Sequence, residues 1–210
     1  MYSYLILNIS FSLITCILGH MATVNLPLET MRDACSPNQE RDVEECLKPL
    51  VDYATNLHAN IQTFPGLGGP QVFETLCSLF REFRGCAQRN RCQSVGVDAM
   101  EASYGYMCGE GYNYFKDHMD CFMKVEQDSE YGRCRTASIH SIEQLKHMEA
   151  NNPGLYLDRL CGLMREYLSC SKPVILELCG RTAWGLVTKI SDDSLRISIP
   201  TCNLKDIFND

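Results

Sequence analysis

Twelve cysteines lie downstream of an apolar N-terminal stretch. Their number and spacing are the strongest indication of chemical function in this chain, because cysteines can bind metals, carry out redox reactions or form disulfides. Structural zinc sites and thioredoxin-like redox sites use closely spaced pairs such as Cys-x-x-Cys, whereas no two of these cysteines are closer than Cys86 and Cys92. In an oxidising compartment such a set is read as a disulfide framework, so we predict that all twelve form six bridges. They are Cys35, Cys46, Cys77, Cys86, Cys92, Cys108, Cys121, Cys134, Cys161, Cys170, Cys179 and Cys202.

No other group completes a recognisable catalytic or metal-binding motif. His140 and His147 share a helix face with Glu143 between them, which could ligate a metal, but exposed polar positions on a short amphipathic helix explain the pattern as well. Gly66-Leu-Gly-Gly69 has the shape of the calcium loop of secreted phospholipases A2, yet no His-Asp pair follows on the next helix. We predict no catalytic residues, no metal ligands and no cofactors. The alternative is a small secreted hydrolase, at most phospholipase A2-like.

Four arginines crowd one short segment and form a candidate patch for an anionic glycan: Arg81, Arg84, Arg89 and Arg91. The same residues, with Glu82 among them, also fit a solvated helix face. The formal net charge of -7 argues against a nucleic-acid partner, because phosphate neutralisation needs a net basic face. The partner is therefore expected to be an unknown extracellular protein or glycan.

The N-terminal residues predict export. Residues 1–19 carry no charge and form an apolar stretch that is too short for a comfortable membrane span. We interpret them as a signal peptide that is cleaved after residue 19 or residue 22, and the alternative is an uncleaved anchor. Nothing later approaches the length of a spanning helix, so we expect no membrane span in the mature form. Removing Cys16 with the signal leaves the even set of cysteines. The predicted location is secreted and extracellular.

The elements that must position the cysteines are helices, and one helical phrase occurs twice. Leu76-Cys77-Ser-Leu79-Phe-Arg-Glu-Phe-Arg-Gly-Cys86 returns as Leu160-Cys161-Gly-Leu163-Met-Arg-Glu-Tyr-Leu-Ser-Cys170. The fold class is therefore all-α, a disulfide-stapled helical domain over 35–202 with two related six-cysteine halves at about 35–108 and 121–202. Cysteines nine residues apart face opposite sides of a helix, so the bridges should tie helix to helix. With on the order of ten thousand pairings available, the connectivity stays open.

The remaining pattern marks where helices begin and end. Ser36-Pro-Asn-Gln39 predicts a helix start, and Pro49 predicts a kink or break within that helix. Further starts are expected at residue 98 and residue 141, and further helices at 112–125, 155–170 and 173–190. Residues 195–199 alternate weakly, as in a strand.

The cysteine order and several motifs resemble the domain of nematode chondroitin proteoglycan 4 and its secreted relatives. The motifs are Leu-Cys-x-Leu-x-Arg-Glu, Tyr104-Gly-Tyr-Met-Cys108-Gly-Glu-Gly, the segment from Phe115 through Cys121, and Leu178-Cys179-Gly-x-x-Ala183. Another nematode family of twelve-cysteine exported domains looks broadly similar. The resemblance covers about 35–202 and implies a non-enzymatic protein of matrix or eggshell material. Proteoglycans attach chondroitin at Ser-Gly, and no serine here precedes glycine, so the chain resembles the folded domain without the sugar-bearing part.

Overall fold

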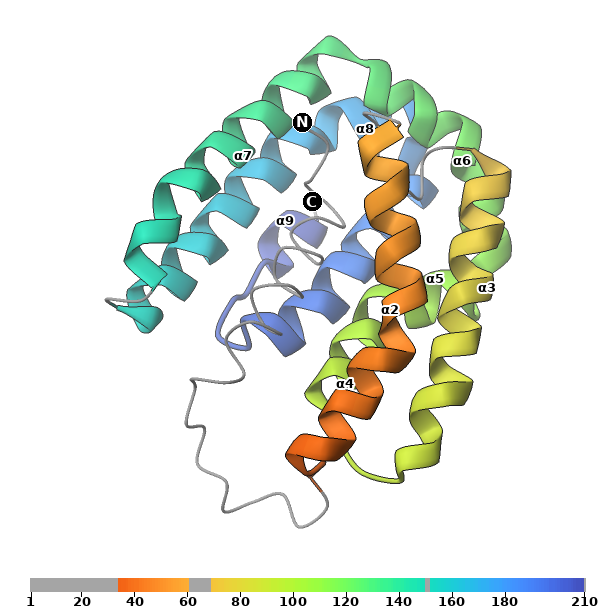
Figure 1. The fold of residues 1–210 in the computed structure, drawn as a ribbon. Helices are drawn as coiled ribbons and strands as arrows, with labels where there is room; N and C mark the ends of the chain where they lie inside the picture. Colours follow the sequence, from red (N-terminus) through yellow and green to blue (C-terminus); the bar gives the residue numbers. More distant parts are fainter. Residues whose placement is uncertain (1–33, 61–68, 150–151, 210) are drawn as a thin grey trace.

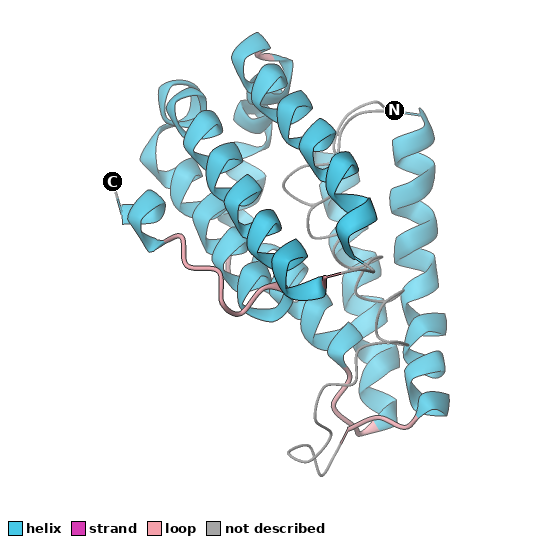
Figure 2. Ribbon diagram, turned by 90° about the vertical axis from the view of Figure 1, so that its left-hand side faces the viewer, coloured by secondary structure: helices cyan, strands magenta, loops and turns pink. Residues whose placement is uncertain are grey.

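The computed structural model describes residues 34–60, 69–149 and 152–209, and the regular elements in these ranges are helices (Figures 1 and 2). An isolated bridge joins Ala34 to Gln93. The all-α, disulfide-stapled fold class is confirmed. The elements are α2 (Pro37–Asn60), α3 (Pro70–Ala87), the 3-10 helix η3 (Gln88–Asn90), α4 (Val95–Met100), the π-helix η4 (Glu101–Gly105), α5 (Tyr106–Cys108), α6 (Tyr112–Gln127), α7 (Ser129–Glu149), α8 (Pro153–Ser198) and α9 (Lys205–Asn209). The expected signal peptide lies outside the described residues.

Two long helix pairs stand at the sides of the molecule, α2 beside α3 and α7 beside α8 (Figure 1). The short segments α4, η4 and α5 lie between them, and α4 and η4 pack against α8. The helix α6 leads from the first pair to the second. Buried side chains from both halves form one continuous core, which includes Phe83 and Tyr167 at matching places in the repeated phrase. The halves are thus related in sequence but share their interior.

The start of α2 follows the capping box that the sequence predicts. The Ser36 amide donates to Gln39 Oε1 over 2.9 Å, and the Gln39 amide donates to Ser36 Oγ over 3.4 Å. The expected break at Pro49 is wrong, because α2 continues through it to Asn60. Pro49 is exposed, so water can bond the carbonyl that loses its amide partner, while Leu47 and Leu50 on the other side stay buried.

The long helix α8 replaces two expected helices and the expected strand. Asn152 caps its start by accepting from the Leu155 amide over 3.1 Å, and the helix continues through residues 171 and 172 without a gap. The chain leaves helical geometry at Gly180, whose φ of 77° favours glycine. Residues 195–198 are helical, because Leu195 continues a buried stripe with Val187 and Ser191 at a spacing of four residues.

Two helix starts lie earlier than the sequence predicts. The helix α4 begins at Val95 with Ser94 as its cap, in place of a start at residue 98. The helix α7 begins at Ser129, in place of a start at residue 141, and Asp128 Oδ1 accepts from the amides of Glu130 and Tyr131. In both cases a polar residue upstream of the expected cap accepts hydrogen bonds from amides in the first turn of the helix.

Candidate functional site

The six bridges divide the chain into two closed units. The pairs are Cys35–Cys92, Cys46–Cys86 and Cys77–Cys108, then Cys121–Cys179, Cys134–Cys170 and Cys161–Cys202. In each unit the first cysteine pairs with the fifth, the second with the fourth and the third with the sixth. No bridge joins the two sets of six. The repeated phrase is therefore matched by a repeated covalent framework, a relation that the sequence alone left open.

The second-to-fourth bridge in each unit ties one long helix to the next. Cys46–Cys86 joins α2 to α3, Cys134–Cys170 joins α7 to α8, and the Cα atoms are 5.7 Å apart in both. The chain also bends next to the fifth cysteine of each unit: Arg91, just before Cys92, has a φ of 50°, and Gly180 directly follows Cys179. The first bend lies just before α4, and the second divides α8 into two helical stretches.

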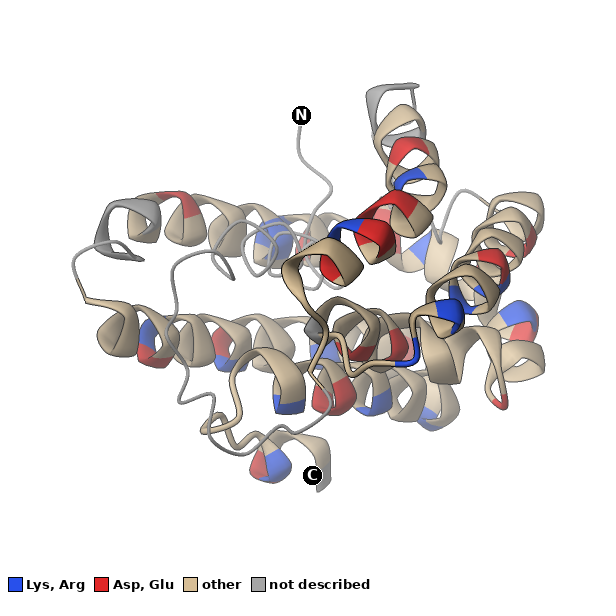
Figure 3. Ribbon diagram, turned by 60° about the horizontal axis from the view of Figure 1, so that its bottom comes forward, with Lys and Arg blue, Asp and Glu red and all other residues tan. Residues whose placement is uncertain are grey.

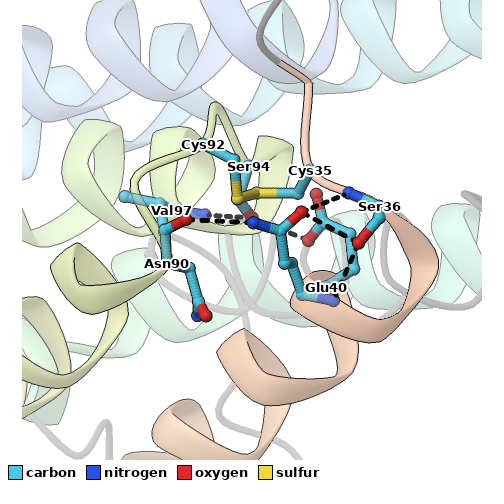
Figure 4. Close-up of a disulfide and its surroundings, with 8 residues drawn as sticks. Cys35, Ser36, Glu40, Asn90, Cys92, Ser94 and Val97 are labelled. Carbon is cyan, nitrogen blue, oxygen red and sulfur yellow. Dashed lines mark hydrogen bonds between the residues drawn. A yellow bond between two sulfur atoms is a disulfide. The ribbon is translucent and has the colours of Figure 1, made fainter.

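A polar network surrounds Cys35–Cys92 and closes the first unit (Figure 4). Gln39 Nε2 donates to the Asn90 carbonyl over 3.0 Å, and the Cys35 amide donates to the Gln93 carbonyl over 3.0 Å. Ser94 Oγ donates to Glu40 Oε2 over 2.7 Å and accepts from the Val97 amide over 3.3 Å. The start of α2 is thereby fixed to the start of α4.

Ser94→Ala is expected to lower the free energy of unfolding by about 2 kcal/mol. The change removes the cap of α4 and leaves Glu40 without the hydroxyl of a serine that is 2 % exposed. Urea unfolding followed by circular dichroism measures the loss. Ser129→Ala is the control, because Ser129 is exposed, and its effect should stay within about 0.5 kcal/mol. Equal midpoints for the two variants would contradict this account of Ser94.

The four arginines of the candidate glycan patch do not act as one free group. Arg84 Nε lies 2.5 Å from Glu101 Oε1, and Arg89 Nε donates to the Cys86 carbonyl over 3.2 Å. Arg81 and Arg91 are exposed and have no ion-pair partner among the described residues. Figure 3 shows basic and acidic residues interspersed along the helices of this view. The patch is thus reduced to two unengaged side chains.

The basic residues around the second copy of the phrase hold the C-terminal segment. Arg165 pairs with Asp206 and donates to the Asn203 carbonyl over 2.7 Å. Lys172 donates to the Ile207 carbonyl over 3.0 Å and lies 5.5 Å from the Trp184 ring centroid. Their contacts are structural ones, made to α9 and the loop before it.

A buried polar cluster in the second half is the feature with the most chemical character. Glu126 on α6 pairs with Arg135 on α7 over 2.5 Å, with side chains that are 7 % and 18 % exposed. The hydroxyls of Tyr131 and Tyr167 lie 2.7 Å apart, and Tyr131 also bonds the Glu126 carboxylate. Since a tyrosine hydroxyl has one hydrogen to donate, Tyr131 donates its hydrogen bond to Glu126 and accepts one from Tyr167.

Burial dominates the electrostatics of this cluster. Loss of hydration raises the pKa of the Glu126 carboxyl, although the Arg135 charge and the hydrogen bonds act in the opposite direction. Burial also raises the pKa of both tyrosine hydroxyls, so they stay protonated. Arg135 Nε is buried without a partner among the described residues. The arrangement can therefore hold a proton on Glu126 more tightly than an exposed carboxyl would.

The first half has apolar side chains where the second half has this cluster. Counting from the matched cysteines, Arg135 follows Cys134 as Leu47 follows Cys46, and Tyr131 corresponds to Val43. The Phe83 position is taken by Tyr167. Sequence reasoning missed the cluster, although the change from phenylalanine to tyrosine within an otherwise repeated phrase was a visible signal.

The histidine hypotheses gain no support from the described residues. His140 Nε2 lies 2.9 Å from the Gln144 amide nitrogen, and the His147 side chain and residues 66–68 lie outside the described part. His118 Nδ1 lies 2.7 Å from the Tyr114 carbonyl oxygen of its own helix. Over the described ranges, no group of three or more His, Cys, Asp or Glu side chains is placed to hold a metal ion. No helix in these ranges is long and apolar enough to span a membrane.

The segment that contains the twelve paired cysteines matches a known sequence family. The family model described as a domain of unknown function, DUF19, matches residues 35–203, from the first cysteine of the frame to the residue after the last. The chain belongs to the DUF19 family. No solved structure matches the chain.

Two relatives of this DUF19 chain come from the nematode Caenorhabditis elegans. Uncharacterized protein ZK370.6 is 28% identical over 175 residues, which are 74% of this chain and 82% of that protein. Uncharacterized protein F44E2.4 is 25% identical over 149 residues, which are 71% of this chain but 10% of that protein. The family and its nematode members agree with the expected kind of cysteine-rich domain.

Proposed function

We propose that this DUF19 domain is a secreted, non-enzymatic structural or binding module of extracellular material. The observation that supports the proposal best is the identical pairing order of the two sets of six cysteines. Disulfide frameworks of this density form and persist in oxidising compartments, where they hold a surface in a fixed shape. The resemblance to the chondroitin proteoglycan 4 domain supports a matrix or eggshell setting for this surface.

The partner that we propose is an extracellular protein or an anionic glycan. Arg81 and Arg91 are the side chains of the arginine patch left unengaged among the described residues, so they would carry any glycan contact. Phosphate-rich partners such as nucleic acids are disfavoured by the acidic net charge of -7. A glycan contact through two arginines would be electrostatic and therefore salt-sensitive.

The test uses the full chain secreted from animal cells. Its intact mass before and after reduction should show six bridges and no attached sugar. On chondroitin sulfate resin we expect elution above physiological salt, and Arg81→Ala/Arg91→Ala should elute below it. The control is Arg159→Ala/Arg181→Ala, which removes two exposed arginines from α8 and should elute with the wild type.

Three results would overturn parts of this proposal. Calcium-dependent release of fatty acid from phospholipid vesicles would establish the hydrolase alternative and exclude a purely structural module. Equal elution of both double variants would exclude Arg81 and Arg91 as a glycan contact and leave a protein partner. Free thiols in the secreted protein would remove the disulfide argument itself.

A further inference from the structure

One bridge differs from the others in its electrostatic surroundings. Arg89 Nη2 lies 2.9 Å from Cys86 Sγ, while Arg89 Nε donates to the carbonyl oxygen of the same cysteine. The guanidinium is thereby held against the sulfur by two contacts. Among the residues that the structure describes, no other disulfide sulfur accepts from a charged side chain.

A fixed positive charge beside a sulfur stabilises the thiolate form of that cysteine. A thiol with a lowered pKa is also the better leaving group when its disulfide is attacked. Cys46 has the opposite surroundings along its helix, because Glu45 directly precedes it and Asp42 lies one turn before it. The bridge is therefore polarised, with Cys86 as the sulfur that leaves and Cys46 as the sulfur that is attacked.

The bridge is also reachable from solvent. Cys46 and Cys86 are both half-buried. Exposure alone does not single out this bridge, because three other bridges also join half-buried cysteines and Cys170 is exposed. The contact with Arg89 is what distinguishes it. The corresponding bridge of the second unit, Cys134–Cys170, supplies an internal comparison. Its residue at the place of Arg89, three after the fourth cysteine, is the uncharged Pro173.

We propose that Cys46–Cys86 is a thiol–disulfide exchange site for small extracellular thiols. The thiolate of the small molecule attacks Cys46 Sγ and forms a new sulfur–sulfur bond there. The Cys46–Cys86 bond breaks, and its electron pair stays on Cys86 as a thiolate beside Arg89. A second small thiol then releases Cys46 as a thiolate and leaves as the oxidised small-molecule disulfide.

The exchange would change the first unit and leave the second intact. Cys46–Cys86 is the bridge that ties α2 to α3 directly, so its opening frees the middle of α2 from α3. The start of α2 remains fixed by Cys35–Cys92 and the network around Ser94. The expected product is a folded domain with one loosened helix.

The experiment treats the folded full chain with reduced glutathione at neutral pH, traps free thiols with N-ethylmaleimide and maps the peptides. We expect glutathione on Cys46, N-ethylmaleimide on Cys86 and the other ten cysteines of the frame still paired. Arg89→Ala should slow the opening of this bridge about fivefold, because the leaving thiolate loses its stabilising charge.

Lys48→Ala is the matched control, because it removes an exposed positive charge two residues from Cys46 that has no sulfur contact among the described residues. Its opening rate should equal that of the wild type, which separates the sulfur contact from a general attraction of the anionic glutathione. If another bridge opens first, or glutathione is found on Cys86, the proposal is wrong. An unchanged rate in Arg89→Ala would also refute it. Should Arg89→Ala fail to fold, the position of glutathione on the wild-type chain decides the question.

Discussion

Arg135→Met is expected to lower the free energy of unfolding at neutral pH by about 3–5 kcal/mol, because it leaves the buried Glu126 carboxylate without its counter-charge. Both side chains of this pair are largely removed from solvent, at 18 % and 7 % exposure. Urea unfolding at neutral pH measures the effect. The control is Arg133→Met on the same helix, whose partner Glu130 is 61 % exposed and whose loss should cost less than about 1 kcal/mol.

The first half of the chain supplies a second variant that tests the physical reason. Leu47 occupies the place that corresponds to Arg135, so Arg135→Leu with Glu126→Gln recreates a largely apolar contact. Removing both charges of a buried pair is often neutral or stabilising, whereas removing one is costly. We expect the double variant to recover most of the loss caused by Arg135→Leu alone. Additive losses would show that the cost comes from packing and not from an unpaired charge.

The same cluster predicts a pH dependence with a definite sign. The pKa of Glu126 is raised above its ordinary value of 4.5 in the folded state, so the folded protein binds this proton more tightly than the unfolded chain. The contribution of Glu126 to stability is therefore fully present below the ordinary value. It is lost as the pH rises through the folded pKa. Glu126→Gln should remove this fall in stability. The difference between the stability–pH profiles of the wild type and the variant separates the contribution of Glu126 from those of the other carboxyl groups.

Local patterns predicted the helices well, since each depends on neighbours along the chain. The capping box at Ser36 and Gln39 and the helical phrase from Leu76 to Cys86 both needed only local spacing. The two misplaced helix starts had a local cause, because a polar residue upstream supplied the cap, whereas the strand prediction failed where a tertiary contact outweighed the local signal. Residues 195–198 alternate in polarity but are helical, because Leu195 packs in the shared core.

The disulfide pairing could not be predicted from the sequence, for a different reason. Cysteine spacing excludes disulfide bonds between certain neighbours on one helix. The choice among the remaining pairs depends on how the helices cross. Cys46 meets Cys86 because α2 lies beside α3, and Cys134 meets Cys170 because α7 lies beside α8. The polar cluster was missed similarly, since Glu126 and Tyr167 come from different helices and meet only in the fold.

Cys77→Ala with Cys108→Ala is expected to cause the largest loss among the bridge variants. The cross-link closes a loop with a sequence separation of 31, whose release costs about 3–4 kcal/mol in the unfolded-chain model. Both sulfurs are also buried, so the variant loses packing in the core, worth about another 1 kcal/mol. Secreted yield from animal cells and the urea midpoint measure the effect.

The corresponding bridge of the second unit is the control. Cys161→Ala with Cys202→Ala opens a loop with a separation of 41, but both cysteines are half-buried. Loop closure alone would make this variant slightly the less stable of the two. Burial of the sulfurs reverses the order, so the Cys77/Cys108 variant should have the lower midpoint. The opposite order would mean that the core packing around Cys77 contributes little.

Hydrogen exchange on the Cys77/Cys108 variant would show how far the two units depend on each other. The bridges close each unit separately, which favours a loss of protection confined to α3 and α5. The core is continuous, however, and η4 packs against α8, so a weakened first unit must also uncover part of α8. We expect protection to fall in α3, α5 and α8 and to persist in α7. Loss confined to α3 and α5 would instead show that the covalent frames, not the shared core, set the cooperative unit.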